Sequence, residues 1–293
     1  MMRAFTIILL LSLTTTSKVF CQEKVLTLAK HQIFFQKLNA FQFVDAKQIL
    51  ESKDSSIVEY HFLSAYYYWW QYLTTPFDKT LRVQFLFHLN ASLSSVQNTN
   101  KNALTQYIEL TTYAFYARVS IHEDKYLDAI QYVNKITSII EYSMHRVDES
   151  PYYKLTSGLY NFAAGYGKRN YWYLYPYFLL IPAGDEEKGI VELKSLTDCE
   201  DYLLQNEANY FLMKIYMDGY NDFNYALKYS LSIANSNPTN LIYQGLLYKI
   251  YCEIGLITEV EKQKIVYLER LEEIRKELSL AQYNFLKNIE NIQ

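Results

Sequence analysis

The sequence predicts an all-α protein, because its hydrophobic residues recur at helical spacing and its turn-forming residues are rare. Between Glu207 and Asn240, apolar side chains return every three or four residues, which places them on one face of a helix. Glycine and proline number only 8 and 5 in 293 residues, too few for the many tight turns of an all-β chain. Half of the residues are hydrophobic, so a chain of this length can bury a large core.

The stretch Glu207–Asn240 shows the basic unit most clearly. A first apolar stripe ends near Tyr216, a polar break follows, and a second stripe runs from Phe223 to Ile233. Pro238 ends the second helix, because proline lacks the amide hydrogen that a further helical turn needs. The unit is therefore a pair of helices joined by a turn.

Four residues of this unit fall on signature positions of a known helical repeat if one extra residue is allowed in the turn. They are Leu212, Tyr216, Ala226 and Pro238. The unit resembles a tetratricopeptide repeat, although Met213 stands where that family usually has a small residue. The resemblance implies a right-handed α-solenoid of antiparallel helix pairs, whose concave face binds a partner.

An aromatic-x-x-small pattern recurs along the chain and supports this resemblance. It occurs at Phe43-x-x-Ala46, Phe77-x-x-Thr80, Tyr126-x-x-Ala129 and Phe223-x-x-Ala226. Ala46 and Thr80 are 34 positions apart, which is the length of a tetratricopeptide repeat. A small residue early in the second helix lets the two helices of a pair cross closely. We expect Gly189 to take the same place in a further pair.

We therefore expect one domain, residues 22–293, in which consecutive helices pack in antiparallel pairs. The expected pairs are 23–38 with 41–51, 56–73 with 76–95, 101–118 with 125–143, 152–164 with 185–196, 207–216 with 223–236, and 241–253 with a helix from 258 to the chain end. The last helix is long and charged, as a polar cap that keeps a solenoid soluble should be.

Residues 165–185 interrupt the period and are expected to form a long insertion loop. The segment holds three of the eight glycines and two prolines, and six aromatic residues lie between Tyr171 and Phe178. A structureless loop of about twenty residues in a compact fold usually has a function or packs into a groove. The candidate ligand-binding residues are Tyr166, Lys168, Arg169, Tyr171, Trp172, Tyr173 and Tyr175.

Tyrosine is unusually frequent, with 30 residues, and it gathers in two aromatic clusters. Its ring packs like a hydrophobic side chain while its hydroxyl needs a hydrogen-bond partner. Packing in the core is the favoured interpretation for Tyr66–Tyr72. For Tyr171–Phe178 in the insertion, packing and an aromatic binding groove are both open.

The first 21 residues have the features of a signal peptide. Arg3 supplies a positive charge, Ala4–Leu13 is an apolar run too short to span a bilayer, and a cut after Cys21 is acceptable. We expect the mature chain to be exported, in a periplasm or secreted. A lipid anchor at Cys21 is the disfavoured alternative, since bulky Phe20 precedes the cysteine. No later stretch reaches transmembrane length without charges, so no transmembrane segment is expected.

Charge and the remaining cysteines narrow the function classes further. The net charge is −3, whereas a nucleic-acid binder normally has a basic face, so nucleic acid is not an expected partner. Cys199 and Cys252 fall on opposite edges of a helical layer in the repeat register. A helix of fourteen residues is about 21 Å long, whereas disulfide-bonded Cα atoms lie within about 7 Å. Both cysteines are expected to be free and mostly buried, with no disulfide.

No motif for catalysis, metal binding or cofactor binding is found. The five histidines show none of the spacings of known metal motifs. Gly165–Lys168 invites comparison with a phosphate-binding loop, but Phe162 and Arg169 replace residues that the motif requires. No nucleophile and base can be paired from the sequence. We therefore expect a protein that is not an enzyme and needs no cofactor.

Two hypotheses of function remain. The first is an exported helical-repeat interaction scaffold that binds a protein or peptide partner through its concave face. The second is an envelope solute- or glycan-binding protein with an aromatic pocket at the insertion loop. The second hypothesis depends on the aromatic run Tyr171–Phe178 and on the two cations beside it, Lys168 and Arg169.

Overall fold

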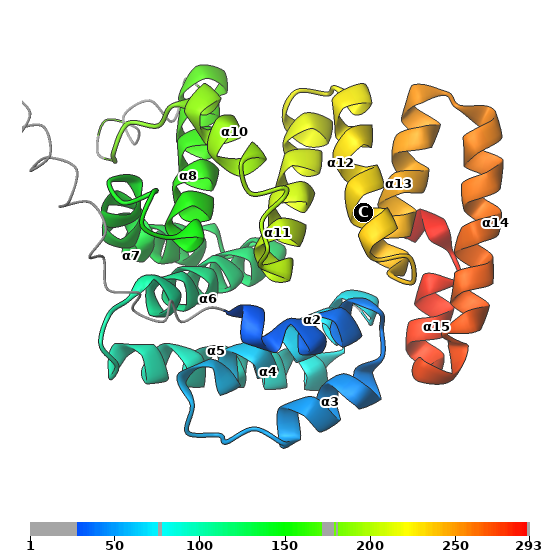
Figure 1. Cartoon of the computed structure of the whole chain (residues 1–293), viewed down its shortest axis with the longest axis horizontal. Helices are drawn as coiled ribbons and strands as arrows, with labels where there is room; N and C mark the ends of the chain where they lie inside the picture. The colour runs from blue at the N-terminus through cyan, green and yellow to red at the C-terminus, as the bar shows by residue number, and fades with distance from the viewer. Residues whose placement is uncertain (1–27, 76–77, 172–178, 180, 292–293) are drawn as a thin grey trace, which may run out of the picture.

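The structure, a computed structural model, describes residues 28–75, 78–171, 179 and 181–291. Within these residues every regular element is a helix, so the all-α prediction is confirmed (Figure 1). The α-helices are α2 (Gln32–Asn39), α3 (Phe43–Glu51), α4 (Val58–Thr74), α5 (Lys79–Gln97), α6 (Ala103–His122), α7 (Tyr126–Met144), α8 (Pro151–Asn170), α10 (Glu186–Lys194), α11 (Tyr202–Lys214), α12 (Phe223–Ser236), α13 (Leu241–Ile254), α14 (Ile257–Glu273) and α15 (Leu280–Leu286).

Helices that are neighbours in the chain pack against each other in pairs. The pairs are α2 with α3, α4 with α5, α6 with α7, α8 with α10, α11 with α12, and α13 with α14. Each pair also touches the next, and α11 to α14 stand side by side in Figure 1. The pairing expected from the apolar stripes is therefore confirmed.

Side-chain caps set the starts of most helices. A short polar side chain just before a helix accepts a hydrogen bond from a backbone amide of the first turn. The capping residues are Asp78, Asn102, Ser150, Asp185, Asp201, Asp222, Asn240 and Ser279. Ser150 precedes proline at the first position of α8, where the missing amide hydrogen of proline costs no helical hydrogen bond.

The alanines of the recurring pattern are buried, and Gly189 lies at a close helix contact. Ala46, Ala129 and Ala226 are all buried. At Gly189 on α10, a Cβ atom would lie 2.4 Å from the backbone nitrogen of Phe162 and 2.6 Å from the carbonyl oxygen of Gly158, both on α8. The backbones of α8 and α10 therefore meet directly, and only glycine fits between them.

The insertion was predicted to begin at residue 165, and this starting point was wrong. Helix α8 continues to Asn170, so residues 165–170 are helical. Gly165 indicated a break in the sequence, but it serves a close contact. A Cβ atom there would lie 2.7 Å from the backbone nitrogen of Glu186, at the start of α10.

The single long C-terminal helix was also a wrong prediction. Helix α14 ends at Glu273, and α15 begins after Ser279. Ser279 and Gln282 form a reciprocal capping box, which starts a new helix without any glycine or proline to mark the break. The Gln282 amide nitrogen then donates to the Thr74 hydroxyl at 3.0 Å, which joins α15 to the end of α4.

One turn departs from α-helical geometry. Residues Ile215–Gly219, directly after α11, form a π-helical turn, in which the Tyr220 amide donates to the Ile215 carbonyl at 3.0 Å. A π-helical turn holds one more residue than an α-helical turn. This turn lies between the two apolar stripes, where the match to a tetratricopeptide repeat allows one extra residue.

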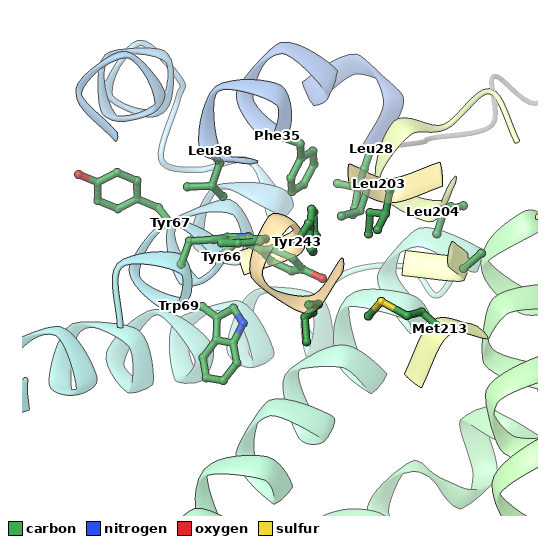
Figure 2. Packing of buried hydrophobic residues seen from close by; sticks show 14 of the residues in the cluster. Leu28, Phe35, Leu38, Tyr66, Tyr67, Trp69, Leu203, Leu204, Met213 and Tyr243 are labelled. Atoms are coloured by element: carbon green, nitrogen blue, oxygen red, sulfur yellow. The ribbon is translucent and has the colours of Figure 1, made fainter. Parts of the chain in front are cut away.

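The aromatic cluster Tyr66–Tyr72 on α4 belongs to the core. Tyr66, Tyr67, Trp69 and Trp70 are buried, so the packing interpretation of this cluster is confirmed. Figure 2 shows Tyr66 beside Tyr243 of α13, with Phe35 and leucines of the N-terminal helices close by. Helix α4 is thus packed on several sides, including by helices distant in the sequence.

Cys199 and Cys252 are both free thiols, as predicted. Cys199 is partly buried, but Cys252 is exposed, so its predicted burial was wrong. Cys252 lies in the last turn of α13, on the side that faces solvent.

Among the described residues, no helix combines the length and the hydrophobicity needed to cross a membrane.

Candidate functional site at the end of helix α8

A buried carboxylate joins three helices across the interior. Glu207 of α11 accepts hydrogen bonds from the hydroxyl of Tyr66 on α4, at 2.5 Å, and from that of Tyr107 on α6, at 2.7 Å. Burial raises the pKa of Glu207, and the two hydroxyls act in the opposite direction. Nearby, the rings of Trp70 on α4 and Tyr243 on α13 meet edge to face, with centroids 5.7 Å apart. First helices of different pairs therefore contact one another directly.

A second carboxylate has a similar structural role. Asp201 caps α11 by accepting from the amides of Leu203 and Leu204, at 3.0 and 3.2 Å. It also accepts from the Tyr152 hydroxyl at 3.0 Å, and that hydroxyl in turn accepts from the Leu28 amide. Burial raises the pKa of Asp201. The network ties the start of the described chain to α8 and α11.

The predicted ligand-binding residues that the structure describes lie together at the C-terminal end of α8. Tyr166 is the fixed centre of this group. Its ring stacks on Phe162, with centroids 5.3 Å apart, and Tyr220 meets it edge-on at 6.1 Å. Its hydroxyl donates to the carbonyl of Gly219, at 2.7 Å, in the π-helical turn after α11.

Arg169 and Tyr171 project from this fixed centre. The Arg169 guanidinium lies 5.7 Å from the Tyr166 ring centroid and donates to Glu186 at 2.8 Å. The Arg169 side chain is still 59% exposed. Tyr171 is 41% exposed and contacts the Tyr166 ring edge-on at 6.3 Å.

Glu186 completes the group from the first turn of α10. It accepts from Arg169 and also from the hydroxyl of Tyr220. Burial and the adjacent Glu186 carboxylate raise the pKa of Tyr220, which keeps its phenol protonated as the donor. Arg169 is therefore held in one orientation by a carboxylate below it and a ring beside it.

We call this surface the α8 shelf, and it presents two cations and an aromatic ring to solvent. Its members are Phe162, Tyr166, Lys168, Arg169, Tyr171, Glu186 and Tyr220. Lys168 is exposed. Trp172, Tyr173 and Tyr175, the other predicted site residues, lie outside the described residues. Such a surface can bind carboxylates through the cations and flat apolar groups through the ring.

Sequence reasoning missed the partners that hold the α8 shelf in place. Tyr220 and Glu186 come from later helices, and nothing in the local sequence around Tyr166 indicates them. Phe162 lies one helical turn before Tyr166, and its aromatic spacing was the only available signal.

A shallow hollow is lined in part by Tyr220. It has a volume of about 540 Å³ and is lined by Tyr220, Asn221, Asp222, Phe223, Asn224, Glu253 and Ile254. This volume lies in the range of small-molecule sites. Its lining is mostly polar, with amide and carboxylate groups near the start of α12.

Within the described residues, no group of three or more histidine, cysteine, aspartate and glutamate side chains is placed to hold a metal ion. Comparison with protein-family models, with curated proteins and with solved structures finds no match for this chain.

Proposed function

We propose that this chain is an exported, non-catalytic scaffold of tetratricopeptide-like helix pairs, arranged as a right-handed solenoid, that binds a segment of another protein. Three features support the proposal. The helices pack in neighbouring pairs, the π-helical turn takes up the extra residue of the best-matched repeat, and two acidic groups of the interior, Glu207 and Asp201, serve in structural hydrogen bonds. The proposal that the chain is exported depends only on the signal-peptide features of residues 1–21.

The docking surface in this proposal is the α8 shelf rather than the centre of the concave face. The contacts of Tyr66, Tyr107 and Glu207 occupy the space between α4, α6 and α11. Arg169 and Tyr171, by contrast, are exposed and held by neighbours that are already in place. This pre-organised pair is the observation that carries the proposal, because ordering side chains on binding reduces affinity.

The expected partner is a protein segment that carries carboxylates next to aromatic side chains. Carboxylates form charge-assisted hydrogen bonds with guanidinium groups, and aromatic rings stack on tyrosine and arginine. Because Arg169 already contacts Glu186 through one nitrogen, its remaining donors are the ones offered to a partner.

Selection of peptides from a random displayed library on the full chain tests this function. We expect enrichment of acidic, aromatic peptides whose binding is lost in the variant Arg169→Ala/Tyr171→Ala. A matched control is Arg146→Ala/Tyr142→Ala, because that exposed pair at the end of α7 has the same composition and a cation–ring distance of 4.3 Å. Peptides that bind both variants equally, or no enrichment at all, would reject the proposal.

Glycan or solute binding is the second candidate function. The polar hollow beside Tyr220 favours it, since amides and carboxylates next to an aromatic ring suit a sugar. A panel of glycans and small solutes should then raise the melting temperature of the full chain, and Asn221→Ala or Asp222→Ala should remove the shift. If no compound of the panel raises the melting temperature while the displayed library yields enriched peptides, peptide binding remains as the single candidate function.

A further inference from the structure

Two histidines that are far apart in the sequence meet on neighbouring helices. The Nδ1 atoms of His61 on α4 and His88 on α5 lie 3.0 Å apart. The ring centroids are 5.3 Å apart, so the two Nδ1 atoms face each other almost head-on. Both side chains are partly exposed. The histidine spacing predicted no such pair, because the hairpin of α4 and α5 creates it.

Aromatic rings surround the pair. Tyr68, two turns after His61 on α4, stacks on the His88 ring at 5.3 Å with a 15° interplanar angle. Tyr60 contacts the His61 ring edge-on at 5.2 Å, and Phe87 contacts the His88 ring in the same way at 5.1 Å. The imidazoles are thus backed by apolar rings and meet only through their nitrogen atoms.

Both imidazoles are neutral at physiological pH. Burial lowers the pKa of His61, and burial together with the His61 ring lowers the pKa of His88 to about 4. In the neutral pair, one Nδ1–H donates to the lone pair of the other Nδ1. If the donor ring instead carries its proton on Nε2, both Nδ1 lone pairs become available to a ligand.

We propose that His61 and His88 form a site for a divalent transition-metal ion, which both bind through Nδ1. Neutral imidazole is the commonest metal ligand in proteins. With metal–nitrogen distances of about 2.0 to 2.1 Å, the observed 3.0 Å separation gives an N–metal–N angle between about 91° and 97°. The two lone pairs face each other along the line between the nitrogens, so each ring must pivot about its own Nδ1 to direct its lone pair at the ion, with the 3.0 Å separation kept.

The angle selects among metals. It matches two adjacent corners of the square-planar or tetragonal geometry that Cu²⁺ prefers, and it is narrower than the tetrahedral angle of Zn²⁺. Cu²⁺ also has the highest affinity among first-row divalent ions for nitrogen ligands. The site therefore binds Cu²⁺ more tightly than Ni²⁺ or Zn²⁺, with water in the remaining positions.

Titration of the untagged full chain with Cu²⁺, Ni²⁺ and Zn²⁺ by calorimetry tests the site. We expect one Cu²⁺ per chain, with an affinity at least tenfold lower for Zn²⁺, and a Cu²⁺ electron paramagnetic resonance spectrum with coupling to imidazole nitrogen. The variants His61→Phe and His88→Phe keep an aromatic ring in the cluster, and each should weaken Cu²⁺ binding at least tenfold. The control His145→Phe, an exposed histidine at the end of α7, should bind as the parent does.

Two outcomes would overturn the proposal. One is Cu²⁺ binding of the parent that neither His61→Phe nor His88→Phe weakens, since the ion would then lie elsewhere. The other is no saturable binding by the parent chain. Unchanged circular dichroism and urea midpoints of the two variants show that lost binding reports on the ligands and not on the fold.

Discussion

His31 provides a sharp test of the interior electrostatics. It lies just before α2, is only 5% exposed, and neither of its ring nitrogens has a hydrogen-bond partner among the residues that the structure describes. Burial lowers the pKa of His31 to about 4, and the charges of Lys53 and Lys30 act in the same direction. Protonation of this ring therefore opposes folding.

The size of the effect follows from linkage. A histidine whose pKa is lower in the folded state binds protons more readily in the unfolded state, so stability falls as the pH drops below the unfolded value of about 6.5. With a folded pKa of about 4, His31 alone removes roughly 2 kcal/mol of stability between about pH 7.5 and pH 5. Above the unfolded pKa the residue has no such effect.

Urea unfolding of His31→Leu at both pH values measures this contribution. Leucine cannot titrate and leaves no buried nitrogen without a partner, so we expect the variant to be no less stable than the parent at the higher pH. At the lower pH the free energy of unfolding of the variant should exceed that of the parent by a further amount of roughly 2 kcal/mol. His145→Leu, at an exposed site, is the control. An acid-induced loss of stability that is the same in His31→Leu and in the parent would refute the reasoning.

Three further substitutions test the packing. Tyr66→Phe removes one donor to buried Glu207 and should lower the free energy of unfolding by about 2 kcal/mol at neutral pH, so an unchanged urea midpoint would contradict the network. Gly189→Ala forces a Cβ atom against the backbone of Phe162 and should cost about 2 kcal/mol or more, whereas a stabilised variant would mean that α8 and α10 can separate. Ser279→Ala removes the cap of α15 and should cost about 1 kcal/mol, measured by thermal unfolding; no change would show that the cap is dispensable.

The helix pairs could be predicted because their causes are local. Each stripe of apolar residues needs a partner helix, and a small residue such as Gly189 marks where the backbones approach. The errors have local causes too. Gly165 ended a predicted helix because glycine is a poor helix former, yet its contact with Glu186 compensates for that weakness. The break before Ser279 carried no glycine or proline, and only its capping box indicated it.

The candidate site was only half predictable. Tyr166, Arg169 and Tyr171 lie close together in the chain, so composition alone indicated them. Tyr220 joins them only because α11 ends beside α8, and Glu207 meets Tyr66 across 141 positions. Contacts at such separations depend on how the pairs stack, and the apolar periodicity of one helix contains no information about that stacking.

Hydrogen–deuterium exchange of the full chain, with and without a selected peptide, tests the central claim that partners dock at the end of α8. The account predicts slower exchange of backbone amides at residues 164–171 and 215–222 when the peptide is bound, with the amides of α4 and α13 unchanged. Protection confined to α4 and α13 would contradict it, because the partner would then enter between helices whose side chains already fill that space.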